Sequence, residues 1–250
     1  MTDENRVFGI RPVAALLDES PESVRRLRVQ RGRDERRISS ILQQAFDHGI
    51  AVERVERDEL ERDFPGCRHQ GIAADFAAAK TWSEHDLYQQ FDALAEPPLL
   101  LILDGVQDPH NLGACFRIAA AVGVHAIVAP KDRAVGLTAS VRQVAAGTAG
   151  RVPFITVVNL SRFLRDLAAR GVWIVGTDGA AENTLYEADL AGPLALVMGG
   201  EGKGMRRLTR SHCDALIRIP MRPSVESLNV AVAAGVCLYE AYRQRDLAIA

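Results

Sequence analysis

The second part of the chain alternates short apolar runs with segments of helical periodicity, and this alternation restricts the fold more than any other feature. Apolar runs that end in Gly, Pro or polar loops are typical of strands buried on both faces of a parallel sheet. Repeated βα units of this kind predict an α/β fold, with a parallel sheet covered by helices on both faces. The expected strands are Leu99–Leu103, His125–Ala129, Val152–Val157, Val172–Thr177, Leu194–Met198 and Ala215–Ile219. The expected helices are Leu112–Val122, Thr138–Ala149, Leu160–Arg170 and Val230–Arg243.

Residues 1–76 show a similar alternation, which predicts a separate small α/β unit. Its expected strands are Val7–Ile10, Val24–Gln30, Ile50–Val55 and Gly71–Phe76, and its expected helices are Pro12–Glu19, Asp34–His48 and Asp58–Phe64. A polar stretch that holds one short amphipathic segment, Leu87–Leu94, and ends in Glu96-Pro97-Pro98 separates the two parts. We therefore predict one domain at 1–79, a linker at 80–98 and a second domain at 99–250.

The composition restricts the class of protein without identifying its function. An apolar content of 48% and a charged content of 25% are typical of a soluble globular protein. The first residues contain no apolar signal core and no run approaches about 18 apolar residues, which predicts a cytoplasmic protein without a membrane span. The four cysteines are scattered without a CxxC pair, so we expect reduced thiols and no metal site.

Two loops follow the last two expected strands, and they are the strongest candidates for a ligand site. Four glycines fall within the six residues Gly199–Gly204, and the segment Pro220–Asn229 precedes the last helix. In open α/β sheets, ligands bind beyond the carboxyl ends of the strands, and glycine lets the backbone approach a ligand closely. The alternative is a tight turn with a solvated Glu201.

The motifs that are absent narrow the choice of ligand. The glycine loop lacks both GxxxxGK[ST] and a GxGxxG after a first strand, which argues against nucleotide triphosphate chemistry and nicotinamide binding. The sequence also contains neither HExxH nor GxSxG, which argues against a metal hydrolase and a serine hydrolase.

The N-terminal unit carries a basic segment. Seven arginines and two acidic residues lie between Arg25 and Arg37, which gives this segment a net charge of +5. Arginine forks suit phosphate groups, so we predict RNA binding here, while the alternative is a set of solvated side chains. The loop Phe64–Gly71 contains two further candidates for a partner contact. The predicted RNA-binding residues are Arg25, Arg26, Arg28, Arg31, Arg33, His69 and Gln70.

Three segments resemble the three motifs of the SpoU, or TrmH-like, RNA ribose 2′-O-methyltransferases. They are NLGACFR at Asn111–Arg117, MGGEG at Met198–Gly202 and SLNV at Ser227–Val230. Longer stretches, including LILDGVQDPHNLGAC and HQGI at His69–Ile72, resemble a subgroup of this family. That subgroup methylates a guanosine ribose in the peptidyl-transferase P-loop of 23S rRNA. The resemblance covers nearly the whole chain.

The resemblance implies a SPOUT (alpha/beta knot) catalytic domain with a C-terminal trefoil knot, after a domain like ribosomal protein L30e. It implies a homodimer with the active site at the subunit interface, acting on 23S rRNA or on a large-subunit assembly intermediate. It also implies S-adenosyl-L-methionine as the cofactor. By position in the motifs, the cofactor-binding residues are Thr177, Gly199, Gly200, Gly202, Ile219, Ser227 and Leu228.

The same resemblance assigns catalytic roles to Asn111, Arg117, Glu201, Ser227 and Asn229. A guanidinium stays protonated, so Arg117 is expected to bind a substrate phosphate and stabilise the developing alkoxide, the alternative being an ion pair with Glu201. Asn111 would orient the substrate or only cap its helix, and Glu201 would orient Arg117 or Asn229. Ser227 and Asn229 would hold the ribose or the cofactor at the start of the last helix, or only cap it.

Two other functions stay open at this point. One is a tRNA ribose 2′-O-methyltransferase, against which the N-terminal unit and the HQG segment argue. The other is a non-catalytic RNA-binding or ribosome-assembly protein, against which the joint presence of the five catalytic candidates argues.

Overall fold

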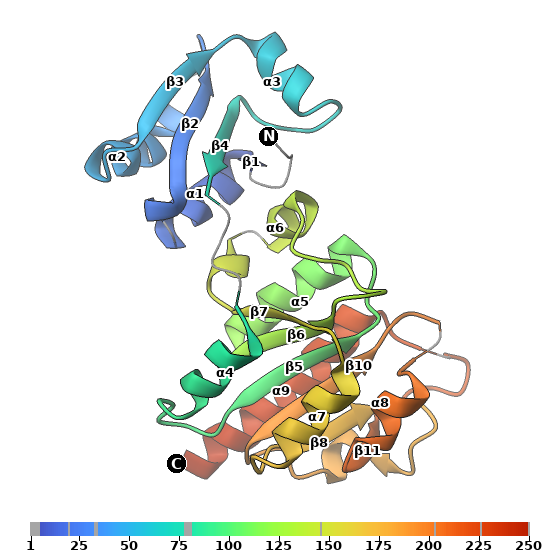
Figure 1. Ribbon diagram of the computed structural model, residues 1–250. Helices are drawn as coiled ribbons and strands as arrows, with labels where there is room; N and C mark the ends of the chain where they lie inside the picture. Colours follow the sequence, from blue (N-terminus) through green and yellow to red (C-terminus); the bar gives the residue numbers. More distant parts are fainter. Residues whose placement is uncertain are drawn as a thin grey trace. The chain divides into compact units, whose positions relative to one another are not determined.

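The structure, a computed structural model, describes residues 6–19, 21–32, 35–77, 82–145, 147–202, 204–225 and 227–249. The chain forms two compact units, one of residues 1–80 and 137–151 and one of residues 81–136 and 152–250 (Figure 1). Residues 137–151, expected from the sequence in the second domain, therefore cluster with the N-terminal unit. Helix α6, Ala139–Ala145, packs against β1, Arg6–Phe8, of that unit.

The N-terminal unit contains a mixed four-stranded sheet in the order β1-β4-β2-β3. Strands β2, Val24–Gln30, and β3, Ala51–Val55, are parallel, and β4, Ile72–Phe76, runs antiparallel to β1 and β2. The helices are α1, Ile10–Glu19, α2, Ser39–Asp47, and α3, Arg57–Asp63. Apolar side chains of α1, α2 and the sheet form one buried core.

Helix α2 begins later than the sequence predicts. A short 3-10 helix, Glu35–Arg37, comes first, and the backbone leaves helical geometry at Ile38, where φ is −129°. The side chain of Ile38 is fully buried in the core of the unit. The helix expected over Asp34–His48 is therefore divided at Ile38, while Asp34 lies outside the described residues.

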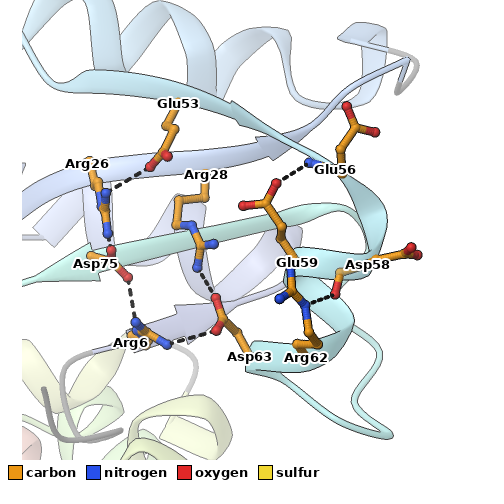
Figure 2. A network of polar contacts seen from close by, with 10 residues as sticks. All are labelled: Arg6, Arg26, Arg28, Glu53, Glu56, Asp58, Glu59, Arg62, Asp63 and Asp75. Atoms are coloured by element: carbon orange, nitrogen blue, oxygen red, sulfur yellow. Dashed lines mark hydrogen bonds and ion pairs between the residues drawn. The ribbon is translucent and has the colours of Figure 1, made fainter.

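Opposite charges on adjacent strands link the sheet of this unit (Figure 2). Asp75 on β4 accepts a hydrogen bond of 2.6 Å from Nε of Arg26 on β2 and lies 3.4 Å from Nε of Arg6 on β1. Arg28 pairs with Asp63 at the end of α3. Asp63 also lies 3.4 Å from Nη1 of Arg6, so this ion-pair network joins α3 to β1 and β2. Cross-strand pairs of opposite charge stabilise a sheet.

The ion-pair network predicts an acid-sensitive N-terminal unit. Burial raises the pKa of Asp63, but the hydrogen bond and charge of Arg28 outweigh it, so the pKa lies below its ordinary value of 3.8. A carboxyl group with a depressed folded-state pKa stabilises the fold at neutral pH and loses this effect as the pH falls below about 5. We expect Asp63→Asn to reduce that pH dependence, measured as hydrogen exchange of β2 and β4 amides at matched pH. Asp58→Asn, on the same helix, is the control, and equal pH dependence in both variants would contradict the prediction.

The second unit contains a parallel sheet in the order β7-β6-β5-β10-β8-β11-β9, which confirms the predicted α/β class. Its strands are β5 Leu99–Asp104, β6 Ala126–Pro130, β7 Phe154–Val157, β8 Trp173–Thr177, β9 Asn183–Thr184, β10 Leu194–Gly199 and β11 Ala215–Arg218. Its helices are α4 Glu84–Phe91, α5 Pro109–Ala121, α7 Leu160–Ala168, α8 Arg207–Ser211 and α9 Val230–Ile249. None of the described helices combines the length and the apolar character that crossing a membrane requires.

Helices cover both faces of this sheet. Figure 1 shows α7 and α8 on one face and α5 and α9 on the other, and α5 packs against α9. Alternate residues of a strand point to opposite faces, and Leu100 and Ile102 of β5 accordingly join the core formed with α4 and α7. The residues predicted as a linker thus include a helix, α4, whose Leu87 is fully buried in this core.

Two helix boundaries differ from the prediction for local reasons. The helix expected over Thr138–Ala149 is α6 followed by a 3-10 turn, Thr148–Gly150, because Gly147 between them has a φ of +101°. Helix α9 continues beyond Arg243 to Ile249, and Gln244 on it donates to the Ala188 carbonyl while its side-chain oxygen accepts from Leu190 N–H. Contacts with the loop before β10 therefore support the extended last turns.

Candidate functional site

A cavity of about 530 Å³ lies in the second unit beyond the carboxyl ends of β8, β10 and β11. All seven residues predicted to bind the cofactor line it: Thr177, Gly199, Gly200, Gly202, Ile219, Ser227 and Leu228. Three of the predicted catalytic residues line it: Glu201, Asn229 and Ser227, which is also among the seven. These residues end or follow β8, β10 and β11, and the parallel sheet brings the carboxyl ends of the three strands to one edge.

The glycine loop lies directly against the end of β5. The amide of Gly200 donates to the carbonyl of Asp104 at 2.9 Å, and the amide of Gly204 donates to the carbonyl of Gly200 at 3.0 Å. A Cβ on Gly199 would lie 2.3 Å from the backbone of Gly204 and Met205. Close backbone packing therefore requires glycine at this position.

Three of the predicted catalytic residues form one hydrogen-bonded chain. The side-chain amide of Asn111 donates to a carboxylate oxygen of Glu201, and the amide of Asn229 donates to Oδ1 of Asn111 at 2.8 Å. Asn111 is 9% exposed, so its amide is almost entirely committed to these two contacts. Glu201 accordingly contacts Asn111, whereas the sequence suggested Arg117 or Asn229 as its partner.

Asn111 is not a helix cap, so the structure excludes one of the two roles that the sequence left open for it. Helix α5 begins at Pro109, and its N-cap is Asp108, whose side chain accepts from the amide of His110 at 2.9 Å. Proline is favoured at the first helical position because the backbone N–H that it lacks would have no partner within the helix there. Asn111 lies inside the first turn, so capping does not explain why its side chain is an amide.

Asn229, by contrast, caps α9 in addition to its contact with Asn111. Its Oδ1 accepts from the amides of Ala231 at 2.9 Å and Val232 at 3.3 Å, which satisfies two N–H groups that a helix start leaves free. The orientation of its Nδ2 toward Asn111 is therefore fixed by the helix itself. Ser227 lines the cavity two residues earlier, before the helix begins.

Arg117 lies apart from the other catalytic candidates. It is exposed on α5 and does not line the cavity. Six residues of an α-helix place it about 120° around the axis from Asn111, because each residue turns the helix by about 100°. Across the described part of the chain, its side chain forms no ion pair with Glu201 or with any other residue.

The cysteines near the site do not supply a reactive thiolate. Burial raises the pKa of Cys115 on α5 to about 12, with a further increase from the charge of Glu201. Burial likewise raises the pKa of Cys213 and Cys237 to about 12. A thiolate, rather than a thiol, is the nucleophile and the metal ligand. Within the described ranges, no group of three or more His, Cys, Asp or Glu side chains is arranged to hold a metal ion.

The predicted RNA-binding arginines fall into two groups. Arg25 and Arg31 are exposed, although Arg31 Nε lies 3.5 Å from a carboxylate oxygen of Glu56. Arg26 and Arg28 already pair with carboxylates of the ion-pair network, so much of the positive charge counted along the sequence is neutralised (Figure 2). Arg33 lies outside the described residues.

His69 and Gln70 hold their own loop in place. Nδ1 of the buried His69 accepts from the amide of Gly71 at 3.1 Å. Gln70 has a φ of +53°, and its side-chain oxygen accepts from the amide of Ile10 at 3.1 Å. Both residues nevertheless line a second cavity, of about 650 Å³, within the N-terminal unit, together with Arg57 and Arg68.

One ion pair beside the site involves residues that no sequence motif indicated. Asp104, at the end of β5, is buried and pairs with Arg206, which precedes α8. Asp104 is the first charged residue after a continuous apolar run, which places it at the carboxyl edge of the sheet. That position could have indicated Asp104 as a residue of the site. Nothing in the local sequence identifies Arg206 as its partner.

A parallel sheet with a cavity of ligand size beyond its central strands defines an α/β protein built to bind a small molecule or cofactor. Comparison with known proteins identifies the family. Residues 98–239 match the SpoU rRNA Methylase family, and residues 6–82 match the family described as RNA 2′-O ribose methyltransferase substrate binding. The chain belongs to the SpoU rRNA Methylase family, as the sequence motifs suggested.

Similar proteins cover almost the whole chain. The 23S rRNA (guanosine-2′-O-)-methyltransferase RlmB of Xylella fastidiosa strain 9a5c is 52% identical over 241 residues, which is 96% of this chain and 97% of the relative. The protein of the same name from Shewanella oneidensis is 51% identical over 98% of this chain and 99% of its own. These alignments include both units.

Solved structures of this family share the fold. The SpoU methyltransferase AviRb from Streptomyces viridochromogenes, in complex with AdoMet, matches with a TM-score of 0.77 and 25% identity. The match covers 97% of this chain and 90% of AviRb. An AdoMet-bound rRNA methyltransferase from Sinorhizobium meliloti matches with a TM-score of 0.74 and 24% identity over 95% of this chain and 86% of its own. This second likeness supports the fold.

Proposed function

We propose that this protein transfers a methyl group from S-adenosylmethionine to the ribose 2′-hydroxyl of a guanosine in 23S rRNA. The observation that carries the proposal is the meeting of three family motifs at one cavity: the second and third motifs line it, and Asn111 of the first motif is hydrogen-bonded to both Glu201 and Asn229. The names of relatives that are 52% and 51% identical support the same substrate and the same reaction. The guanosine in the peptidyl-transferase P-loop remains the predicted target.

The residues of the cavity fit S-adenosylmethionine. Its volume of about 530 Å³ lies within the about 300–1,000 Å³ typical of small-molecule sites. Met198, Ile219 and Leu228 offer apolar contacts, while Thr177, Ser227 and the loop backbone offer polar groups. This mixture suits a ligand with a flat aromatic base and a polar amino-acid end. AviRb, which is 25% identical, was solved with AdoMet, which also supports this cofactor.

The bound cofactor supplies a methyl group that is already activated by its positive sulfur, so the protein has to position and deprotonate a hydroxyl. Asn111 links Glu201 and Asn229, which line the cavity, and in this proposal these three side chains together orient the ribose. Ser227 contacts the ribose or the cofactor. Arg117 binds a substrate phosphate and stabilises the developing alkoxide, because a guanidinium keeps its charge and donates without accepting, and the hydroxyl proton passes to that phosphate or to water.

Arg117 reaches the site from a second copy of the chain in this proposal. It is exposed on α5 and does not line the cavity of its own chain. On the neighbouring helix α9, Val232, Tyr239 and Tyr242 are 53%, 54% and 46% exposed, at spacings that place them on one helix face. An exposed apolar stripe beside an isolated arginine supports a homodimer whose interface includes α5 and α9.

The N-terminal unit binds the RNA in this proposal, and the protein acts in the cytoplasm. The exposed Arg25 and Arg31 supply charge for phosphates, with Arg33 as a further predicted contact. The second cavity, lined by Arg57, Arg68, His69 and Gln70, offers cationic and hydrogen-bonding groups for an unpaired nucleotide. The match of residues 6–82 to a substrate-binding family supports this role. The knotted chain path and the L30e likeness remain predictions of the family resemblance.

The proposal predicts methylation of rRNA and no methylation of tRNA. Unmodified 23S rRNA, made by transcription, is incubated with the protein and tritiated S-adenosylmethionine, beside a tRNA control and an assembling large-subunit particle. We expect alkali-resistant label at one guanosine, in the rRNA or in the particle. Label in tRNA alone would assign the protein to a different substrate. Absence of label from all three RNAs, despite measurable cofactor binding, would favour a non-catalytic RNA-binding protein.

A further inference from the structure

An ion pair beside the proposed cofactor cavity holds both oxygens of one buried carboxylate. The side chain of Asp104, the last residue of β5, has 0% exposure, and its Oδ1 lies 2.6 Å from both Nε and Nη2 of Arg206. The backbone amide of Arg206 donates to Oδ2 at 2.9 Å. Buried carboxylates require partners of this kind, and an arginine fork satisfies them with fixed geometry.

The same aspartate also holds the opposite end of the glycine loop. Its carbonyl accepts from the amide of Gly200 at 2.9 Å, where the loop leaves β10, while its carboxylate binds Arg206, where the loop enters α8. Between these two points, the loop is closed by the hydrogen bond from Gly204 to Gly200. Asp104 therefore fixes both ends of the segment from Gly200 to Met205.

This loop forms one wall of the cavity. Gly200, Glu201, Gly202 and Gly204 all line it, and Glu201 is the partner of Asn111. A displacement of the loop would thus move the cavity wall and the carboxylate that orients Asn111 at the same time. Asp104 and Arg206 do not line the cavity themselves, so any effect they have on a ligand passes through the loop.

A second, weaker ion pair holds the other end of α8. Arg210 lies 3.1 Å from Oδ2 of Asp178, which follows β8. Strands β5 and β8 flank β10 in the sheet, so the two pairs attach α8 on both sides of the strand that leads into the glycine loop. The side chain of Asp178 is 19% exposed, whereas that of Asp104 is fully buried, and exposed pairs contribute little.

We propose that Asp104 and Arg206 are positioning residues that hold the glycine loop in the conformation that binds the cofactor. This inference rests on the proposed use of the cavity for S-adenosylmethionine. A buried ion pair is a weak source of stability compared with apolar packing, but a buried carboxylate without its partner is costly, which favours the loop arrangement that keeps the pair. The pair therefore acts on the geometry of the loop more than on the stability of the unit.

The test uses the Arg206→Gln variant of the full chain, and its matched control is Arg207→Gln, which changes the exposed first residue of α8. Two quantities are measured: the dissociation constant for S-adenosylmethionine, by calorimetry, and hydrogen exchange of residues 199–205 without cofactor. We expect Arg206→Gln to weaken binding at least about tenfold and to accelerate exchange in the loop, since the truncation leaves a buried charge without its partner. Arg206→Lys, which keeps the charge but loses the fork, should recover part of the affinity.

Several outcomes separate this inference from the proposed function. Wild-type protein that binds no S-adenosylmethionine would refute the proposed cofactor, while the loop exchange would still test the positioning role. Wild-type affinity and wild-type loop exchange in Arg206→Gln would overturn the inference alone. A lower melting temperature with unchanged affinity of the folded protein would show a purely structural pair. Asp104→Asn, which preserves shape, provides a second variant should Arg206→Gln fold poorly, and the same two results are expected of it.

Discussion

Replacing Arg117 by alanine should reduce the rate of ribose methylation by about 100-fold to 1,000-fold, the usual effect of removing one donor that stabilises a developing oxyanion. The affinity for S-adenosylmethionine should stay at the wild-type value, because Arg117 is exposed and does not line the cavity. Single-turnover rates at saturating cofactor and calorimetric binding measure the two quantities. Arg165→Ala removes an exposed arginine from α7 and is the matched control. Methylation at the wild-type rate by Arg117→Ala would disprove the assigned role.

The proposed position of Arg117 in a partner's active site has a distinctive consequence. Arg117→Ala and Glu201→Gln should each lose most of their activity alone, and a mixed dimer of the two should contain one intact site. If Arg117 acts across the interface, random mixing of equal amounts restores about a quarter of the sites, since half of the dimers are mixed. If it acts within its own chain, every site carries a defect and no activity returns. Refolding the two variants together and measuring methylation distinguishes these cases.

The strands were the most predictable part of this fold. Continuous apolar runs such as Leu99–Leu103 and Leu194–Met198 correspond to β5 and β10 because a strand buried on both faces must be apolar throughout. Strand β9, Asn183–Thr184, was missed because two polar residues carry no such pattern. Helix starts were less predictable. Helix α5 begins at Pro109 with Asp108 as its N-cap, and the apolar periodicity, which starts at Leu112, does not indicate these two residues.

The candidate site was predicted from family motifs, and physical reasoning alone located only its region. Glycine-rich loops after buried strands indicate a ligand site, but the contact between Asn111 and Asn229 joins residues 118 positions apart in the sequence. For the basic segment, the sequence overestimated the positive charge that is available to a ligand. Counting charges along β2 overlooked Glu53, Asp63 and Asp75, which reach Arg26 and Arg28 only once the unit has folded.

The glycine loop gives the second large effect, through Gly200→Ala. A Cβ at this position would lie 2.4 Å from the carbonyl oxygen of Gly105, and both the new methyl group and that carbonyl are fixed by backbone. Contacts under about 3 Å cannot be relieved by a side-chain rotation here, so the loop itself has to move. Overpacking of this kind costs about 1–3 kcal/mol.

The added methyl group should mainly destabilise the cofactor-binding conformation of the loop, because Gly200 lines the cavity and precedes Glu201. We expect the affinity of Gly200→Ala for S-adenosylmethionine to fall roughly tenfold to 100-fold, and methylation at low cofactor concentration to fall with it. Gly192→Ala is the control, since a Cβ there meets nothing within 4 Å. Calorimetry gives the affinity and thermal unfolding gives the folded fraction. Unchanged affinity in a fully folded Gly200→Ala protein would mean that the loop does not contact the cofactor.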